Sequence, residues 1–296
     1  MAFSLSGVIP PMVTPLDGNE RLDQDGTKKL VDHLVKGGVD GIFLLGSSGE
    51  FTALKKDVKI KLMEQVKVFV GNDLPLLAGV SEPGTELTLE TIKISAEAGM
   101  DAVVVSPPYY FPLGQDGVLE HYRYLGKNSP VPIILYNIPL TTGVHIELET
   151  IKILSEEKVI YGIKDSSGDF IHFRKLVRAM KEKGGCQVMQ GHEALAAPSL
   201  MIGADGLVPA YANVIPGLYV DLKKAFVNRN LEKTLFLQDK IDDCISTYAY
   251  GSVYGSIKFA LKKLGICEEY LTKPLQYPSK EEKEKISGLL ESFLVK

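Results

Sequence analysis

Residues 159–165 read Val-Ile-Tyr-Gly-Ile-Lys-Asp, an apolar run that predicts a buried β-strand ending on a lysine. Residues 132–139 read Pro-Ile-Ile-Leu-Tyr-Asn-Ile-Pro and form a second run of this kind, with a tyrosine at the equivalent place. Neither run alternates apolar and polar residues, which is typical of parallel strands that are covered on both faces. The fold should therefore contain a parallel sheet with helices packed around it.

The same strand-then-helix unit recurs along the chain at intervals of roughly 20 to 30 residues. Further apolar runs lie at residues 7–13, 41–46, 74–80, 102–106, 187–190 and 206–209, and helical patterns follow at 25–36, 55–70, 92–98, 115–127, 147–157, 170–183, 192–202 and 215–228. Eight such units predict an α/β fold of the closed (β/α)8 TIM barrel type. A doubly wound open sheet is the alternative because strand order is not visible in a sequence, but the first unit lacks a glycine-rich phosphate fingerprint.

The strand pattern stops at about residue 230. Residues 231–248, 253–264 and 281–294 predict three helices. We expect residues 1–230 to form the barrel and residues 231–296 to form a C-terminal helical extension of the same domain. The extension should pack on the outside of the barrel or against another subunit.

The composition fits an ordinary globular protein, since 45% of the 296 residues are hydrophobic and 24% are charged. The net charge is -4 and no dense basic cluster occurs, so we expect neither a nucleic-acid nor a membrane partner. Residues 1–4 show no secretion signal and no run approaches about 18 apolar residues, so we expect a cytoplasmic protein. The widely spaced Cys186, Cys244 and Cys267 agree with a reducing compartment.

Chemical groups should gather where the strands end, because active sites of barrels lie at that face. Burial at a strand end disfavours the ammonium form of Lys164, and an uncharged lysine amine is a nucleophile. With Tyr136 at a neighbouring strand end, this amine could form an imine with a carbonyl substrate. The alternative is that Lys164 pairs with Asp165 or extends to solvent.

Four other strand ends carry candidate site residues. Ser47 and Ser48 lie between glycines at residues 46–50, where hydroxyl and backbone N–H groups could hold a carboxylate, although such a turn can also exist without a ligand. Tyr109 and Tyr110 lie in a stiff Pro-Pro-Tyr-Tyr loop that could serve packing as well as a site. Residues 191–193, Gly-His-Glu, and residue 208, a valine, follow the last two strands. No metal-ligand spacing is present.

Together these motifs resemble the dihydrodipicolinate synthase / N-acetylneuraminate lyase superfamily of pyruvate-dependent class I aldolases. The resemblance rests on Gly-Ser-Ser-Gly-Glu at 46–50, Pro-Pro-Tyr-Tyr at 107–110, Tyr-Asn-Ile-Pro at 136–139 with Thr-Gly at 142–143, and Gly-Ile-Lys-Asp at 162–165. It covers the whole barrel, with the motifs in the same order. It implies a homotetramer (a dimer of dimers) of TIM barrels with helical extensions, acting on pyruvate and an aldehyde without a metal or an organic cofactor.

The resemblance also implies roles for single residues. Lys164 would form the imine with the keto carbon of a 2-oxo acid, and Tyr136 would donate and accept protons. Ser47 matches the hydroxyl of the proton relay. Tyr110 matches a tyrosine that a neighbouring subunit contributes in many members. Ser48 and Val208 match positions that hold the pyruvate carboxylate and backbone.

Two departures from the family pattern narrow the expected substrate. Synthases of the lysine pathway carry an arginine where this chain has Thr141, and threonine cannot make a bidentate charged contact with a carboxylate. Sialic acid lyases carry Gly-x-Asp-Glu after the seventh strand and a serine after the eighth, where this chain has Gly191-His192-Glu193-Ala194 and Ala210.

We therefore expect a 2-keto-3-deoxy sugar acid aldolase, with Gly191 in the substrate site and with neutral or weakly charged contacts to a polyol tail from Thr141, Thr142, His192 and Glu193. The alternatives are 4-hydroxy-tetrahydrodipicolinate synthase, N-acetylneuraminate lyase, a sugar-acid dehydratase, and a barrel that binds 2-oxo acids without catalysis.

Overall fold

The computed structural model describes residues 4–294 and contains one sheet of eight parallel strands. The strands are β1 (Gly7–Val8), β2 (Ile42–Leu44), β3 (Leu76–Gly79), β4 (Ala102–Val105), β5 (Ile133–Asn137), β6 (Gly162–Asp165), β7 (Gln187–Gln190) and β8 (Gly206–Leu207). Each strand from β2 to β7 pairs with the next one in the chain, and β8 pairs with β1. A bridge between Pro11 and Phe43 joins the segment after β1 to β2. The sheet is therefore a closed barrel as predicted, and the open-sheet alternative is wrong.

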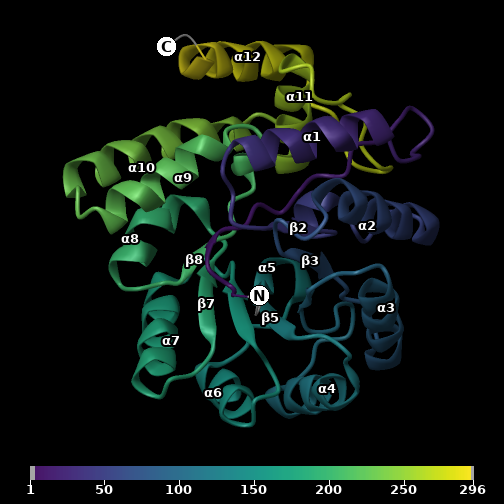
Figure 1. Cartoon of the computed structure of the whole chain (residues 1–296), viewed down its shortest axis with the longest axis vertical. Coiled ribbons are helices and arrows are strands. Elements are labelled where there is room, and N and C mark those ends of the chain that lie inside the picture. Colours follow the sequence, from purple (N-terminus) through teal and green to yellow (C-terminus); the bar gives the residue numbers. More distant parts are fainter. Residues whose placement is uncertain (1–3, 295–296) are drawn as a thin grey trace.

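Helices follow the strands and surround the barrel (Figure 1). They are α1 (Gln24–Lys36), α2 (Lys56–Val70), α3 (Thr85–Glu97), α4 (Gln115–Asn128), α5 (Pro139–Thr142), α6 (Leu148–Glu156), α7 (Phe170–Glu182), α8 (Ala196–Met201) and α9 (Pro216–Val227). Short 3-10 turns η1 (Ser47–Gly49), η2 (Glu193–Leu195) and η3 (Tyr211–Asn213) follow β2, β7 and β8. The helical patterns of the sequence thus correspond to the outer layer of the barrel.

Two apolar clusters explain why the strands are apolar on both faces. The larger cluster lies between the sheet and the helices and includes Leu44, Val103, Leu135 and Ile163. The smaller one fills the barrel interior and consists of Leu5, Ile9, Phe43, Leu77, Ala102, Val104, Ile134, Tyr136, Met189 and Val208, with Ile138 packed against it. Because side chains alternate along a strand, consecutive residues belong to different clusters.

Two segments differ from the prediction. The expected strand at residues 7–13 is limited to β1, because Pro10 and Pro11 lack the N–H groups that a longer ladder requires. The expected helix at residues 192–202 is divided into η2 and α8.

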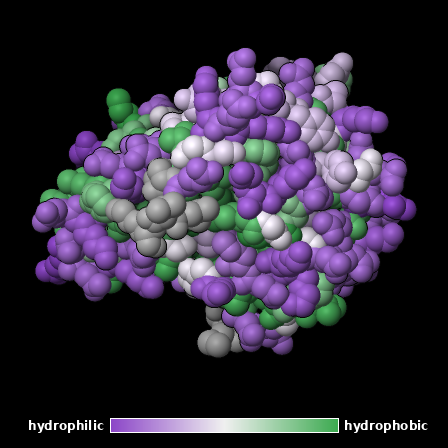
Figure 2. Space-filling view, turned by 90° about the horizontal axis from the view of Figure 1, so that it is seen from above, coloured by the Kyte–Doolittle hydropathy of each residue, from purple (hydrophilic) through white to green (hydrophobic). Residues whose placement is uncertain are grey.

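The C-terminal extension contains α10 (Leu231–Ile245), the 3-10 turn η4 (Ser246–Ala249), α11 (Val253–Lys263) and α12 (Lys280–Leu294). α10 packs against α9, and α12 packs against α11 at the end of the molecule (Figure 1). The face seen from that end is mostly hydrophilic, with smaller hydrophobic areas (Figure 2). Residues 1–3 and 295–296 of the expected segments lie outside the described residues.

Two further features concern the described residues as a whole. Cys186, Cys244 and Cys267 are free thiols. Within residues 4–294, none of the helices has the length and apolar character needed to cross a bilayer.

Candidate active site

Lys164 and Tyr136 lie side by side in the barrel, because β6 and β5 pair in a register that sets one opposite the other. The Nζ atom of Lys164 lies 3.7 Å from the centroid of the Tyr136 ring and 5.1 Å from that of Phe43. Lys164 is 5% exposed and Tyr136 is 7% exposed. The structure therefore joins the two predicted residues in one poorly hydrated place.

Asp165 does not serve as the partner of Lys164. Its carboxylate accepts hydrogen bonds from Asn137 Nδ2 at 2.7 Å, and from the Ser167 hydroxyl at 2.7 Å and backbone N–H at 3.0 Å. Asn137 Oδ1 in turn accepts from the Ile146 N–H at 3.1 Å. These buried bonds tie the ends of β5 and β6 together on the side facing the helices. The alternative of a Lys164–Asp165 pair is thus wrong.

Gly191 and Val208 border the same interior. A Cβ atom added to Gly191 would lie 2.0 Å from Ser166 Oγ and 3.1 Å from Lys164 Cε, so a larger residue would displace the Ser166 hydroxyl and crowd the lysine stem. The Val208 side chain belongs to the interior cluster that also holds Tyr136, and its N–H donates to the Gln190 carbonyl at 2.8 Å. Both residues therefore lie at the ends of β7 and β8, as predicted from the sequence.

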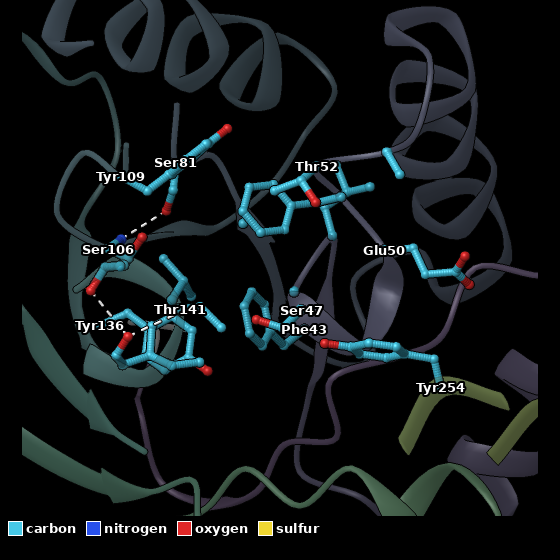
Figure 3. A pocket seen from close by; sticks show the side chains of 18 of the residues that line it. Phe43, Ser47, Glu50, Thr52, Ser81, Ser106, Tyr109, Tyr136, Thr141 and Tyr254 are labelled. Atoms are coloured by element: carbon cyan, nitrogen blue, oxygen red, sulfur yellow. Dashed lines mark hydrogen bonds between the residues drawn. The ribbon is translucent and has the colours of Figure 1, made fainter. Parts of the chain in front are cut away.

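A cavity of about 430 Å³ opens beside this pair, with Tyr136 and Phe43 in its wall (Figure 3). Its other described lining residues are Leu45, Gly46, Ser47, Glu50, Phe51, Thr52, Ala53, Gly79, Ser81, Val104, Ser106, Tyr109, Ile138, Thr141, Thr142, Tyr254, Pro274 and Leu275. None of these lining residues is a lysine or an arginine. A volume of this size fits a small organic acid with a short tail.

The hydroxyls of the predicted serine turn differ in exposure to the cavity. Ser47 lines it, whereas Ser48 is buried within η1. The turn is held from outside because Thr14 donates to the Gly49 carbonyl at 2.7 Å. Glu50 ends it in a left-handed conformation with φ 61°.

Thr141 and Thr142 lie on the short helix α5, which no pattern in the sequence indicated. Both line the cavity, and both hydroxyls donate to the Ile138 carbonyl, at 3.4 Å and 3.0 Å respectively. Thr142 also accepts from the Val144 N–H at 3.2 Å. Thr141 is the more exposed of the two. It occupies the position at which synthases of the lysine pathway carry an arginine.

Tyr110 does not reach the cavity of its own chain. Its side chain is 84% exposed, its backbone has a positive φ of 86°, and its ring packs edge to face on Phe111 at 5.1 Å. The preceding Tyr109 lines the cavity instead, and burial raises the pKa of its phenol, with a further contribution from Glu82.

Glu193 was expected to contact substrate, but it is not among the described residues that line the cavity. Its buried carboxylate accepts from Tyr219 Oη at 2.5 Å, from the Tyr211 N–H at 2.8 Å and from Tyr248 Oη at 2.8 Å. Burial raises the pKa of Glu193, although these three donors oppose the shift. Glu193 thus joins η2 to the elements behind it, and the neighbouring His192 is exposed beside Gly168.

Several cavity residues were not predicted from the sequence. Ser81 and Ser106 follow β3 and β4, and the Ser106 N–H donates to Ser81 Oγ at 2.8 Å (Figure 3). Their positions at the ends of two predicted strands could have identified this pair. Tyr254, Pro274 and Leu275 come from the C-terminal extension, which therefore covers part of the cavity and does not only pack outside the barrel. Burial raises the pKa of Tyr254, with smaller contributions from Tyr136 and Glu50.

An amine next to a phenol at a cavity wall can form an imine with a ketone and move protons during its reaction. The hydroxyls of Ser47, Ser81 and Ser106 add hydrogen-bonding groups around the same space. Within residues 4–294, no group of three histidine, cysteine or acidic side chains lies close enough to hold a metal ion.

Comparison with known proteins identifies the family to which the chain belongs. Residues 4–293 match the model of the Dihydrodipicolinate synthetase family. The chain is 31% identical to 4-hydroxy-tetrahydrodipicolinate synthase of Methanothrix thermoacetophila over 96% of its length and 95% of that protein. It is 29% identical to the probable 2-dehydro-3-deoxy-D-pentonate aldolase YjhH of Escherichia coli, over 96% of each chain. The structure of YagE from E. coli K12, a prophage protein of this family in complex with pyruvate, superposes with a TM-score of 0.94 at 26% identity and covers 99% of each chain. The chain therefore belongs to the dihydrodipicolinate synthetase family and is a carbon-carbon lyase.

Proposed function

We propose that this protein cleaves a 2-keto-3-deoxy sugar acid to pyruvate and an aldehyde through an imine on Lys164. The observation that carries the proposal is the in-register pair of Lys164 and Tyr136, in which the amine lies 3.7 Å from the centroid of the phenol ring and Tyr136 lines the cavity. An aldolase of this class needs these two groups and a space for the tail of the substrate.

The reaction begins when the Lys164 amine attacks the keto carbon and water leaves, so that a protonated imine forms. Tyr136 then takes the proton of the hydroxyl on the carbon that becomes the aldehyde. The bond between the third and fourth carbons breaks, and its electron pair enters the imine to give an enamine. Protonation of the enamine and hydrolysis release pyruvate and restore Lys164. Because the imine itself accepts the electron pair, the proposed reaction needs neither a metal nor an organic cofactor.

The residues that line the cavity favour a substrate whose aldehyde half is uncharged. No lysine or arginine is among the described residues that line it, so a second carboxylate would lack a cationic partner. Hydroxyls of Ser81, Ser106, Thr141 and Thr142 could instead contact a polyol tail. The name of the E. coli relative YjhH, a probable pentonate aldolase, points to the same class of substrate.

Borohydride trapping with pyruvate tests the reaction class. The intact protein should gain the mass of pyruvic acid less one oxygen, at Lys164, and Lys164→Ala should gain nothing. Pyruvate release from 2-keto-3-deoxygluconate is then compared with condensation of pyruvate and aspartate semialdehyde. If condensation dominates, the protein is a synthase and the proposed substrate is wrong. If the unmodified protein gives no adduct, the aldolase proposal itself is wrong.

We further propose that the protein is a homotetramer in which Tyr110 completes the site of a neighbouring subunit. The support is that its side chain is 84% exposed and is not among the residues that line its own cavity. Coexpression of Lys164→Ala with Tyr110→Phe tests this, because a mixed oligomer contains subunits with Lys164 beside a neighbour with Tyr110. Activity above that of either variant alone supports the proposal, and its absence argues that Tyr110 has no role across subunits.

A further inference from the structure

Glu50 and Lys258 form a fully buried ion pair between the turn after β2 and helix α11. Lys258 Nζ lies 2.5 Å from Glu50 Oε1, and both side chains are 0% exposed. In every other described ion pair, both side chains keep some exposure to solvent. Burial lowers the pKa of Lys258, although Glu50 opposes the shift.

The two side chains also bind the segment that follows α11. Glu50 Oε2 accepts from the Thr272 N–H at 2.7 Å and from its hydroxyl at 2.8 Å. Lys258 Nζ donates to the Tyr270 carbonyl at 2.6 Å. The pair thus joins three parts of the chain that are far apart in sequence. Because a buried ion pair contributes little net stability over apolar residues of similar size, stability alone is a weak reason for its presence.

Each of the three parts carries a group into the cavity. Ser47 lies three residues before Glu50, Tyr254 lies four residues before Lys258, and Leu275 lies three residues after Thr272. One turn of helix separates Tyr254 and Lys258, so both project from the same face of α11. Figure 3 shows the Tyr254 hydroxyl directed toward Ser47, while the Glu50 carboxylate points away from both. Ser47 and Tyr254 thus line the same cavity from the serine turn and from α11.

We propose that Glu50 and Lys258 are positioning residues for the aldol step, which fix the spacing between Ser47 and Tyr254. This inference rests on the function proposed above. Neither residue touches the reacting atoms; the pair acts by holding Ser47 and Tyr254 at the cavity. The amine and the phenol that form the pyruvate imine lie on β6 and β5, outside the parts that the pair joins, so an adduct on Lys164 should still form at saturating pyruvate.

Variants Lys258→Met, Glu50→Gln and their combination separate positioning from stability. Each single variant leaves one buried group without its partner and should lower Tm by about 5–10 °C. Each should also lower kcat for cleavage about 10- to 100-fold at 25 °C, because small displacements of positioned groups are costly. The double variant removes both charges and should recover most of the Tm but not the kcat. Pyruvate adducts trapped by borohydride should match those of the unmodified protein throughout.

The exposed pair of Arg123 and Glu157 provides the matched control, because it also joins two elements, α4 and the end of α6. Arg123→Met, Glu157→Gln and their combination should leave both kcat and Tm close to the original values.

A single tryptophan supplies a readout independent of activity, because the natural chain contains none. In a Tyr254→Trp background, acrylamide quenching should increase when the buried pair is removed and stay constant when the control pair is removed. The inference is overturned if kcat returns together with Tm in the double variant, or if quenching is unchanged. If the unmodified protein forms no pyruvate adduct, the proposed function fails, and the quenching experiment still tests the spacing.

Discussion

Replacement of Glu193 tests whether this carboxylate is structural or contacts substrate. In Glu193→Ala, the Tyr219 and Tyr248 hydroxyls and the Tyr211 N–H lose their buried acceptor. At about 1–3 kcal/mol for each unsatisfied group, with some relaxation, the free energy of unfolding should fall by about 3–6 kcal/mol. That is a large part of the roughly 5–15 kcal/mol that ordinarily stabilises a domain.

Glu193→Gln should behave differently, because an amide resembles the protonated acid in size and hydrogen bonding. Burial raises the folded-state pKa of Glu193 above its ordinary value of 4.5. The folded protein therefore binds this proton more tightly than the unfolded chain does. The resulting stability is complete below pH 4.5 and is lost as the pH rises through the folded-state pKa. Relative to the natural protein, Glu193→Gln should thus become more stable as the pH increases from about 4 to 7.

The assay is urea unfolding followed by circular dichroism at several pH values, together with cleavage kinetics at 25 °C. We expect Glu193→Gln to keep KM and kcat within about twofold, because the carboxylate is fully used by its protein donors. A tenfold rise in KM with unchanged stability would refute this reasoning and return Glu193 to the substrate site.

Three further predictions concern the reaction and the pH response. Tyr136→Phe should still give the trapped adduct on Lys164, but should lower kcat about 100- to 10,000-fold in a pyruvate-release assay, since it removes the proton-transfer group; an unchanged kcat would exclude this role. Thr141→Arg should raise the rate of condensation with aspartate semialdehyde at least tenfold, by supplying a cation for its carboxylate, and no gain would show that residue 141 does not choose the substrate. Burial lowers the pKa of His121 to about 4, so the folded protein loses stability as the pH falls from 6.5 through 4. His121→Gln should reduce this loss in urea titrations at pH 7 and pH 4, whereas an equal loss would contradict it.

The barrel and the reactive pair could be predicted because they depend on local patterns. Continuous apolar runs mark strands covered on both faces, and residues at the ends of such strands share one face of a barrel. Lys164 and Tyr136 end two consecutive strands, and parallel pairing of neighbours brings them together although 28 positions separate them. Ser47 and Val208 follow the same logic, whereas Ser48 is buried within η1.

The rest of the cavity depends on contacts that no local pattern contains. Tyr254 lies on a helix whose sequence resembles any amphipathic helix, and only its docking on the barrel brings it beside Ser47. The position of Glu193 after β7 predicts a substrate contact, whereas the three donors that hold its carboxylate come from later parts of the chain and could not be predicted from it. The orientation of Tyr110 away from its own cavity likewise follows from a left-handed backbone that the sequence does not reveal.

The contribution of Tyr254, Pro274 and Leu275 to the cavity has an evolutionary consequence. The reactive pair lies on β5 and β6, whereas these three lining residues lie between residues 254 and 275 of a separate helical extension. Under the function proposed above, changes in this segment could alter which substrate is accepted and leave the reactive pair intact. Chimeras that exchange this segment between relatives are therefore a direct route to new aldolase specificities.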